Sequence, residues 1–269
     1  MSLQPTTLKP TTSKSYHLKM NHLTQYILGT ADNTLILGQR LGELCGHGPI
    51  LETDIAMTNI ALDLLGQTRS YYQYAAQIAN DEKVTEDTIA FLRNERDYRN
   101  VLLVEQPNTD FAYSITRQFL FDVYHLLLLT ELQHSKDETL QAIAKKSIKE
   151  VTYHVRFSSD WIIRLGDGTE ESNEKMQNAI DDLWTFTDEL FHQTDADIEM
   201  VNQKIGVDVK LLKEPFYKKV SEILETATLK TPESKYFQKG GKLGIHSEHM
   251  GFLLADMQYM QRSFPGMSW

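Results

Sequence analysis

The stretch Asn59-Ile60-Ala61-Leu62-Asp63-Leu64-Leu65-Gly66-Gln67 stands in the middle of a long segment, residues 52–79, whose apolar side chains recur with the period of an α-helix. Ile55, Leu62 and Leu65 are predicted to share one face of this helix. A helix of this length with an apolar face needs other helices to pack against. The stretch therefore predicts a helical bundle.

Seven further segments have helical periodicity, and strand signals are nearly absent. They are residues 22–46, 85–100, 109–134, 137–165, 170–193, 208–228 and 247–263. Asp137 and Thr169 are suited to cap the helices that they precede, and Gly166 and Gly168 are suited to left-handed turns. Four long helices with short connections predict an all-α protein, an antiparallel four-helix bundle with additional C-terminal helices.

The domain organisation follows from where this periodicity begins. We expect residues 1–20, which carry Pro5 and Pro10 and lack periodic apolar residues, to be a disordered N-terminal extension. We expect residues 21–269 to form a single domain, because one bundle accounts for all the segments. The extension lacks the apolar core of a signal peptide, and no apolar run approaches the length of a membrane span.

Composition excludes several classes of function. The formal net charge is -10, whereas general nucleic-acid binding needs a basic surface. Cys45 is the single cysteine, so an internal disulfide is impossible, which fits a cytoplasmic protein. Cys45 has no activating neighbours in the sequence, and we expect a buried, inert thiol.

Polar residues on apolar helical faces are the candidates for a site. A di-iron bundle places one carboxylate on each of two helices and a Glu-x-x-His pair on each of the other two. Glu43 and Asp122 occur on the first and third long helices, and Glu150 occurs on the fourth. Glu43 near a helix end also fits a solvated residue, and a hydrogen bond between Asp122 and His125 is the favoured interpretation of that pair.

Two interruptions break the di-iron pattern. Leu64 and Gln67 stand where Glu-x-x-His is required, and neither is a normal iron ligand. Tyr153 stands three residues after Glu150, while His154 comes one residue late and is turned by about 100°. We therefore predict that this chain binds no metal. The remaining buried carboxylates should then be protonated, or paired with His125, His154 or a basic residue such as Arg40.

Several longer motifs resemble the C subunits (PaaC) of ring-1,2-phenylacetyl-CoA epoxidase, a ferritin-like family. They are the stretch quoted first, Arg40-Leu41-Gly42-Glu43-Leu44-Cys45-Gly46-His47-Gly48-Pro49, Leu102-Leu103-Val104-Glu105-Gln106-Pro107-Asn108 and Gly240-Gly241-Lys242-Leu243-Gly244-Ile245-His246-Ser247-Glu248-His249-Met250-Gly251. The resemblance extends over nearly the whole chain after Met20.

The resemblance implies a structural, non-catalytic subunit of a multicomponent monooxygenase. A homologous A subunit would carry the di-iron centre that epoxidises phenylacetyl-CoA with dioxygen during aerobic phenylacetate degradation. NADPH would supply electrons through a reductase with flavin and iron–sulfur groups, and small accessory subunits would complete the assembly. Two alternatives remain open: a di-iron monooxygenase in its own right, using Glu43, Asp122, Glu150 and His154, and a stand-alone module that binds a CoA thioester.

Two segments are candidates for contact with phenylacetyl-CoA at the subunit interface. Arg93, Arg96 and Arg99 recur every three residues and are predicted to form one strip of the helix at 85–100, suited to phosphate groups. Acidic residues interleave with them, so a solvated charged face is the alternative. The resemblance implies substrate contacts at Asp97, Tyr98, Arg99 and Asn100, and at Ile198, Glu199 and Met200.

Overall fold

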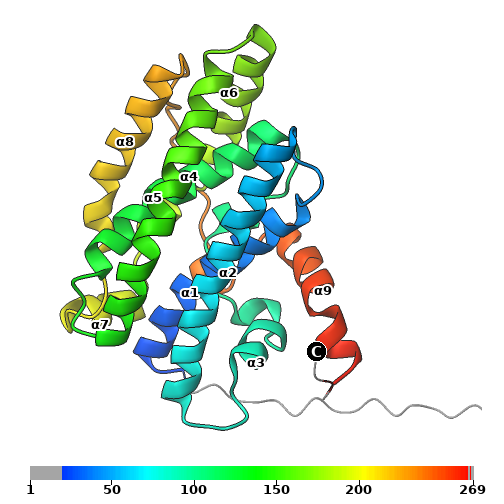
Figure 1. Ribbon diagram of the computed structural model, residues 1–269. Coiled ribbons are helices and arrows are strands. Elements are labelled where there is room, and N and C mark those ends of the chain that lie inside the picture. Colours follow the sequence, from blue (N-terminus) through cyan, green and yellow to red (C-terminus); the bar gives the residue numbers. More distant parts are fainter. Residues whose placement is uncertain (1–19, 266, 268–269) are drawn as a thin grey trace, which may run out of the picture.

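A computed structural model describes residues 20–265 and residue 267. Its centre is formed by four long helices, α1 (His22–Glu43), α2 (Leu51–Ala79), α4 (Phe111–Leu132) and α5 (Glu138–Gly166) (Figure 1). No β-strand occurs among the described residues, and the prediction of an all-α, ferritin-like bundle is confirmed. Apart from Met20, the predicted N-terminal extension at residues 1–20 lies outside the described part of the chain.

Side-chain hydrogen bonds show how the long helices align. The hydroxyl oxygens of Thr34 on α1 and Thr68 on α2 are 2.8 Å apart. Gln67 on α2 donates to Glu150 on α5, while one turn earlier Asp63 lies 2.9 Å from His154. Because rising residue numbers on α2 meet falling numbers on α5, these two helices are antiparallel.

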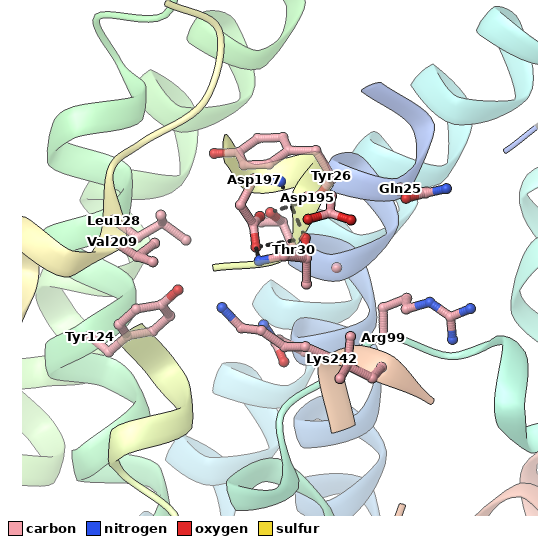
Figure 2. A pocket seen from close by; sticks show the side chains of 14 residues that line it. Gln25, Tyr26, Thr30, Arg99, Tyr124, Leu128, Asp195, Asp197, Val209 and Lys242 are labelled. Carbon is pink, nitrogen blue, oxygen red and sulfur yellow. Dashed lines mark hydrogen bonds between the residues drawn. The ribbon is translucent and has the colours of Figure 1, made fainter. Parts of the chain in front are cut away.

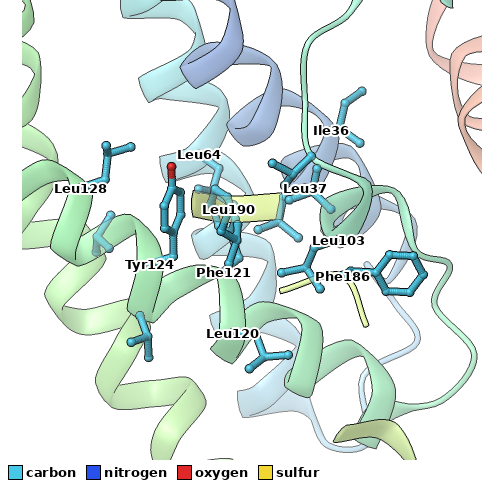
Figure 3. Close-up of a cluster of buried hydrophobic side chains, with 14 of the residues drawn as sticks. Ile36, Leu37, Leu64, Leu103, Leu120, Phe121, Tyr124, Leu128, Phe186 and Leu190 are labelled. Atoms are coloured by element: carbon cyan, nitrogen blue, oxygen red, sulfur yellow. The ribbon is translucent and has the colours of Figure 1, made fainter. Parts of the chain in front are cut away.

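The core lies between the long helices, and Leu64 is part of it. Leu64, Leu37, Phe121 and Leu190 are almost completely buried and come from different elements (Figure 3). Burying a leucine side chain stabilises the fold by about 1.5–3 kcal/mol. The leucine that interrupts the ligand pattern therefore contributes to packing.

Further helices surround the bundle. α6 (Glu170–Trp184) and α8 (Lys213–Thr226) pack against α4 and α5, and α7 (Asp195–Asn202) packs against α1. α9 (Glu248–Ser263) extends away from the bundle beside the short α3 (Glu86–Phe91) (Figure 1). Short 3-10 turns connect these elements: η1 (Glu95–Asp97), η2 (Leu102–Glu105), η3 (Asp188–Phe191), η4 (Val209–Leu212) and η5 (Gly241–Leu243). The expected additional C-terminal helices are thus present.

The helix predicted at residues 85–100 is wrong in its second half. α3 ends at Phe91, and the chain continues as an irregular loop that contains η1. Arg93 turns inward and pairs with the buried Asp32 instead of lining a strip with Arg96 and Arg99. A tertiary ion pair has overridden the local helical pattern. The segment predicted at 170–193 likewise ends its α-helix at Trp184 and continues through η3.

The capping predictions and the glycine predictions had different outcomes. Asp137 accepts a hydrogen bond from the backbone N–H of Leu140, and Thr169 accepts one from Ser172, so both predicted N-caps are confirmed. Gly166 and Gly168 do not adopt left-handed backbone angles. A Cβ at Gly166 would lie 2.5 Å from the carbonyl oxygen of Ala227, so close packing is the reason for glycine there.

Two further predictions about burial are wrong. Ile55 and Leu62 are 52% and 61% exposed, because α2 turns its face with Ile60 and Leu64 toward the core. Cys45 is exposed, because α1 ends at Glu43 and the following loop carries the thiol outward. Of the apolar stripe of α2 that periodicity identified, Ile55 and Leu62 therefore lie on the surface of the single chain, whereas Leu65 packs partly against the core.

Candidate functional site

A polar seam joins α2 to α5 where a di-iron bundle would hold metal ligands. The amide of Gln67 donates to Glu150 Oε2 over 2.9 Å. One turn away, His154 Nε2 lies 2.9 Å from Asp63 Oδ2, and the imidazole is completely buried. Burial lowers the pKa of His154, an effect that Asp63 and Glu150 partly oppose. The two helices are thus joined by protein-to-protein pairs at this level.

Asp122 is completely buried in the core and has no cationic hydrogen-bond partner among the described residues. The amide of Gln118 donates to one carboxyl oxygen over 2.6 Å, and the hydroxyl of Ser158 donates to the other over 2.8 Å. Burial raises the pKa of Asp122 well above its ordinary value, although these two hydrogen bonds act in the opposite direction. Asp122 is therefore a buried carboxyl group whose two oxygens accept hydrogen bonds from neutral donors.

The favoured hydrogen bond between Asp122 and His125 is wrong. Neither ring nitrogen of His125 has a hydrogen-bond partner within the described residues, and the ring packs 5.2 Å from that of Phe121. Burial, assisted by the nearby His154, lowers the pKa of His125 to about 3. His125 is neutral in the fold and compensates no carboxylate. A helical spacing of three residues placed both side chains in the core but did not make them meet.

Glu43 does not join this seam. On α1, Thr34 is the residue that contacts Thr68, which is next to Gln67 of the seam. Glu43 lies nine residues further along α1, which is about 13 Å at 1.5 Å per residue. There its carboxylate accepts two 3.0 Å hydrogen bonds from Arg40 and one from Asn108. Glu43 is thus an exposed carboxylate paired with Arg40 near the end of the bundle, and it is not one of the buried carboxylates for which compensation was expected.

These side chains do not fit a di-iron group. Leu64 is core, Gln67 is bound to Glu150, and Tyr153 is turned outward with its ring stacked near Phe157. Within residues 20–265, no group of three or more potential ligands lies close enough together to hold a metal ion. The carboxylates that remain, Glu43, Asp122 and Glu150, already accept hydrogen bonds from other protein groups. That the chain binds no metal remains a prediction.

The first segment predicted to contact substrate, Asp97–Asn100, forms an ordered loop against α1. Tyr98 and Asn100 are fully buried, Arg99 is half-buried and Asp97 is exposed. The hydroxyl of Tyr98 donates to the carbonyl of Ala90, and Asn100 donates to Glu105. In the single chain, the side chains that this loop offers to a ligand are therefore Arg99 and Asp97.

The second segment, Ile198–Met200, lies on α7, where Ile198 is exposed and Met200 is buried. A cavity of about 230 Å³ lies between α7 and α1 (Figure 2). Arg99 and Lys242 contribute to its wall, and α7 contributes Asp195 and Asp197. Arg99 of the first segment thus lines the cavity, whereas α7 reaches it through residues that precede the predicted Ile198–Met200 segment.

Sequence reasoning missed three buried carboxylates that organise this region. Asp32 binds Arg93 and the backbone N–H of Arg99. Glu189 accepts backbone hydrogen bonds from Leu102 and Gly240. Glu105 lies 2.5 Å from His246, and although burial opposes it, this partner raises the pKa of His246. A signal was available for Asp32, since helical spacing places it on one face with the apolar residues Leu28, Leu35 and Ile36.

The surface carries apolar side chains that the single chain leaves uncovered. Leu51, Ile55 and Leu62 lie exposed along α2, and Phe252 and Tyr259 lie exposed on α9. Apolar patches on a folded protein commonly mark interaction sites. Among the described helices, none combines the length and the apolar character required to cross a bilayer.

The fold is that of a ferritin-like helical bundle. In the region where such a bundle would hold its iron ligands, Gln67 is hydrogen-bonded to Glu150 and Asp63 to His154. The chain belongs to the PaaA_PaaC family of phenylacetic acid catabolic proteins, whose model matches residues 8–269. It is also 50% identical, over 250 residues, to the C subunit of 1,2-phenylacetyl-CoA epoxidase from Escherichia coli (strain K12). That alignment covers 93% of this chain and 100% of the relative. The family resemblance predicted from the motifs is confirmed.

Proposed function

We propose that this chain is a structural subunit of a phenylacetyl-CoA 1,2-epoxidase complex, without catalytic activity of its own. The observation that carries the proposal is the polar seam, in which Gln67 binds Glu150 and Asp63 binds His154. These pairs occupy the donor atoms that a working di-iron centre would need. The similarity to the C subunit of an epoxidase supports the same role.

The proposed partner is a homologous A subunit that holds the di-iron centre. The exposed apolar residues of α2 and α9 support a chain that is covered by another protein. The family model is shared by A-type and C-type proteins, as its name states, which supports a partner of the same fold. A reductase carrying flavin and iron–sulfur groups would deliver electrons from NADPH, and small accessory subunits would complete this cytoplasmic assembly.

We also propose that phenylacetyl-CoA touches this chain at the subunit interface. Arg99 supports this, because a half-buried guanidinium beside a cavity is suited to a phosphate group of the CoA moiety. Lys242, which lines the same cavity, would add a second cationic group for such a phosphate. The chain would thus contribute to binding while the chemistry occurs on the partner.

The test is to compare this chain alone and co-expressed with an A subunit. We expect stoichiometric iron and ring epoxidation only in the co-expressed complex. Glu150→Gln in this chain should leave both iron content and turnover within about twofold of wild type, because Gln67 can still bind the amide. Iron bound by the chain alone, or loss of turnover from an intact, iron-loaded Glu150→Gln complex, would instead support a di-iron enzyme in its own right.

A binding measurement distinguishes the proposed structural subunit from the alternative of a stand-alone module that binds a CoA thioester. Titration of the isolated chain with phenylacetyl-CoA should give weak binding, because half of the interface is missing. Binding as tight as that of the complex would favour the carrier module and contradict the structural role.

A further inference from the structure

We propose that Asp32 is a positioning residue, which fixes the shape of the Asp97–Asn100 loop and thereby the place of Arg99 at the substrate cavity. This inference rests on the proposed function, in which the loop meets phenylacetyl-CoA. Asp32 lies in the middle of α1 and its side chain is completely buried. It is therefore a positioning group that cannot itself touch a ligand.

Asp32 holds the loop directly through the backbone. Its Oδ2 accepts a 2.8 Å hydrogen bond from the backbone N–H of Arg99. A hydrogen bond to an ionised carboxylate inside a protein is stronger than one between neutral groups. This contact fixes the main chain at the residue whose side chain reaches the cavity.

Asp32 also holds the loop indirectly through Arg93. The guanidinium of Arg93 donates to both carboxylate oxygens, over 2.9 Å and 2.6 Å. The same guanidinium donates to the carbonyl of Asp97 and lies 4.0 Å from the centre of the Tyr98 ring. Asp32 thus orients a cation that in turn holds two residues of the loop.

The side chain of Arg99 depends on this loop geometry. Its Nη1 donates to the carbonyls of Arg96 and Tyr98, so the direction of the guanidinium follows the backbone on which it sits. Figure 2 shows Arg99 at the rim of the cavity, on the side away from Tyr124. A change in the backbone at Arg99 would therefore displace the group proposed to meet the phosphate.

The experiment uses the complete complex of this chain with its di-iron partner and reductase, turning over phenylacetyl-CoA. Asp32→Asn weakens the hold on Arg93 and on the Arg99 N–H without changing the size of the side chain. We expect the KM for phenylacetyl-CoA to rise about tenfold, with kcat within about twofold, since charged hydrogen bonds of this kind are among the stronger ones. Amide hydrogen exchange of residues 97–101 should accelerate in the same variant.

Two controls separate positioning from general loss of stability. Thr68→Val removes a buried hydrogen bond between α1 and α2 that involves neither Asp32 nor Arg93, and Asp137→Ala removes the N-cap of a distant helix. Both should leave KM and exchange at 97–101 unchanged. If Asp32→Asn fails to fold, Asp32→Glu keeps the charge and changes its reach, and the same rise in KM is expected.

Arg99→Gln separates the positioning role from the substrate contact. If Arg99→Gln raises KM while an assembled Asp32→Asn complex does not, the positioning role is overturned and the proposed substrate contact survives. If neither variant changes KM, the substrate contact itself is wrong and the positioning role falls with it. Faster exchange together with an unchanged KM in Asp32→Asn would show a purely structural role, which also overturns the proposal.

Discussion

Asp32 and Asp122 are both fully buried carboxyl groups in the same bundle, yet their hydrogen-bond partners differ in charge. Asp122, beside the polar seam, is surrounded by the neutral donors Gln118 and Ser158, and burial raises its pKa well above the ordinary value. Asp32 faces the guanidinium of Arg93 at 2.6 Å and accepts four hydrogen bonds in all. One carboxyl group thus has a counter-ion, whereas the other has only neutral hydrogen-bond donors.

This difference separates two kinds of region. The hydrogen bonds from Gln118 on α4 and Ser158 on α5 to Asp122 join two helices, so this region is suited to holding helices together. An ion pair that also binds a loop makes the position of that loop dependent on charge. Asp122 and Glu150, which remain from the ligand pattern, therefore stabilise the bundle. The ion pair between Asp32 and Arg93, which the sequence did not predict, lies near the region that we propose for substrate.

The largest expected effect comes from removing the counter-ion. Arg93→Ala leaves Asp32 buried and unpaired, and we expect the free energy of unfolding to fall by about 3–5 kcal/mol. Urea denaturation monitored by circular dichroism measures it. Arg69→Ala, which breaks the exposed pair with Glu86, is the control and should cost less than about 1 kcal/mol. An equally small loss of unfolding free energy for Arg93→Ala would refute the claim that Asp32 depends on Arg93 as its counter-ion.

The next largest effect is on how stability changes with pH, and it comes from the raised pKa of Asp122. Its folded-state pKa lies above the unfolded value of 3.8, so the folded wild type loses stability as pH rises from about 4 toward the folded pKa. Asp122→Asn carries no such penalty. The free energy of unfolding of Asp122→Asn, relative to that of wild type, should therefore rise with pH by at most about 1.4 kcal/mol per pH unit.

Urea denaturation of both proteins at about pH 5 and pH 7 measures this slope. A difference between them that stays constant with pH would show that Asp122 is ionised in the fold, like Asp32. The two regions would then share one mechanism of neutralisation.

The smallest of the three effects comes from His125. Its folded-state pKa of about 3 lies below the ordinary 6.5, so wild type loses stability as pH falls through 6.5. Relative to wild type, His125→Leu should gain about 2 kcal/mol between pH 7 and pH 5, since this span contains about 1.5 units below 6.5. At pH 7 the variant should not be less stable, because the ring nitrogens have no partner among the described residues. A loss above about 1 kcal/mol at pH 7 would reveal a hidden partner.

Sequence patterns predicted the long helices well and the faces of those helices less well. The bundle helices, the caps at Asp137 and Thr169, and the interruptions at Leu64 and Gln67 follow from spacing and residue type. The outward turn of Ile55 and Leu62 does not, because a partner-facing stripe has the same periodicity as a core-facing one. Periodicity reports that a face is apolar without saying what covers it.

The candidate site shows the same division. Residue types at positions 64, 67 and 153 were sufficient to predict that the ligand pattern is broken. The pairs that replace it, Gln67 with Glu150 and Asp63 with His154, depend on how two helices are aligned and rotated. Spacing within one helix could not supply that, and it wrongly suggested a bond from Asp122 to His125.

By itself, the sequence determined the helical class, the family and the loss of metal ligands, because these depend on local periodicity, on motifs and on the chemistry of single side chains. Only the tertiary structure decided how each buried carboxylate is neutralised and that Asp32 reaches Arg93 and Arg99 more than sixty residues away. The physical reason is that the state of a buried charge is set by its three-dimensional neighbours and its distance from water, and neither is encoded in nearby residues.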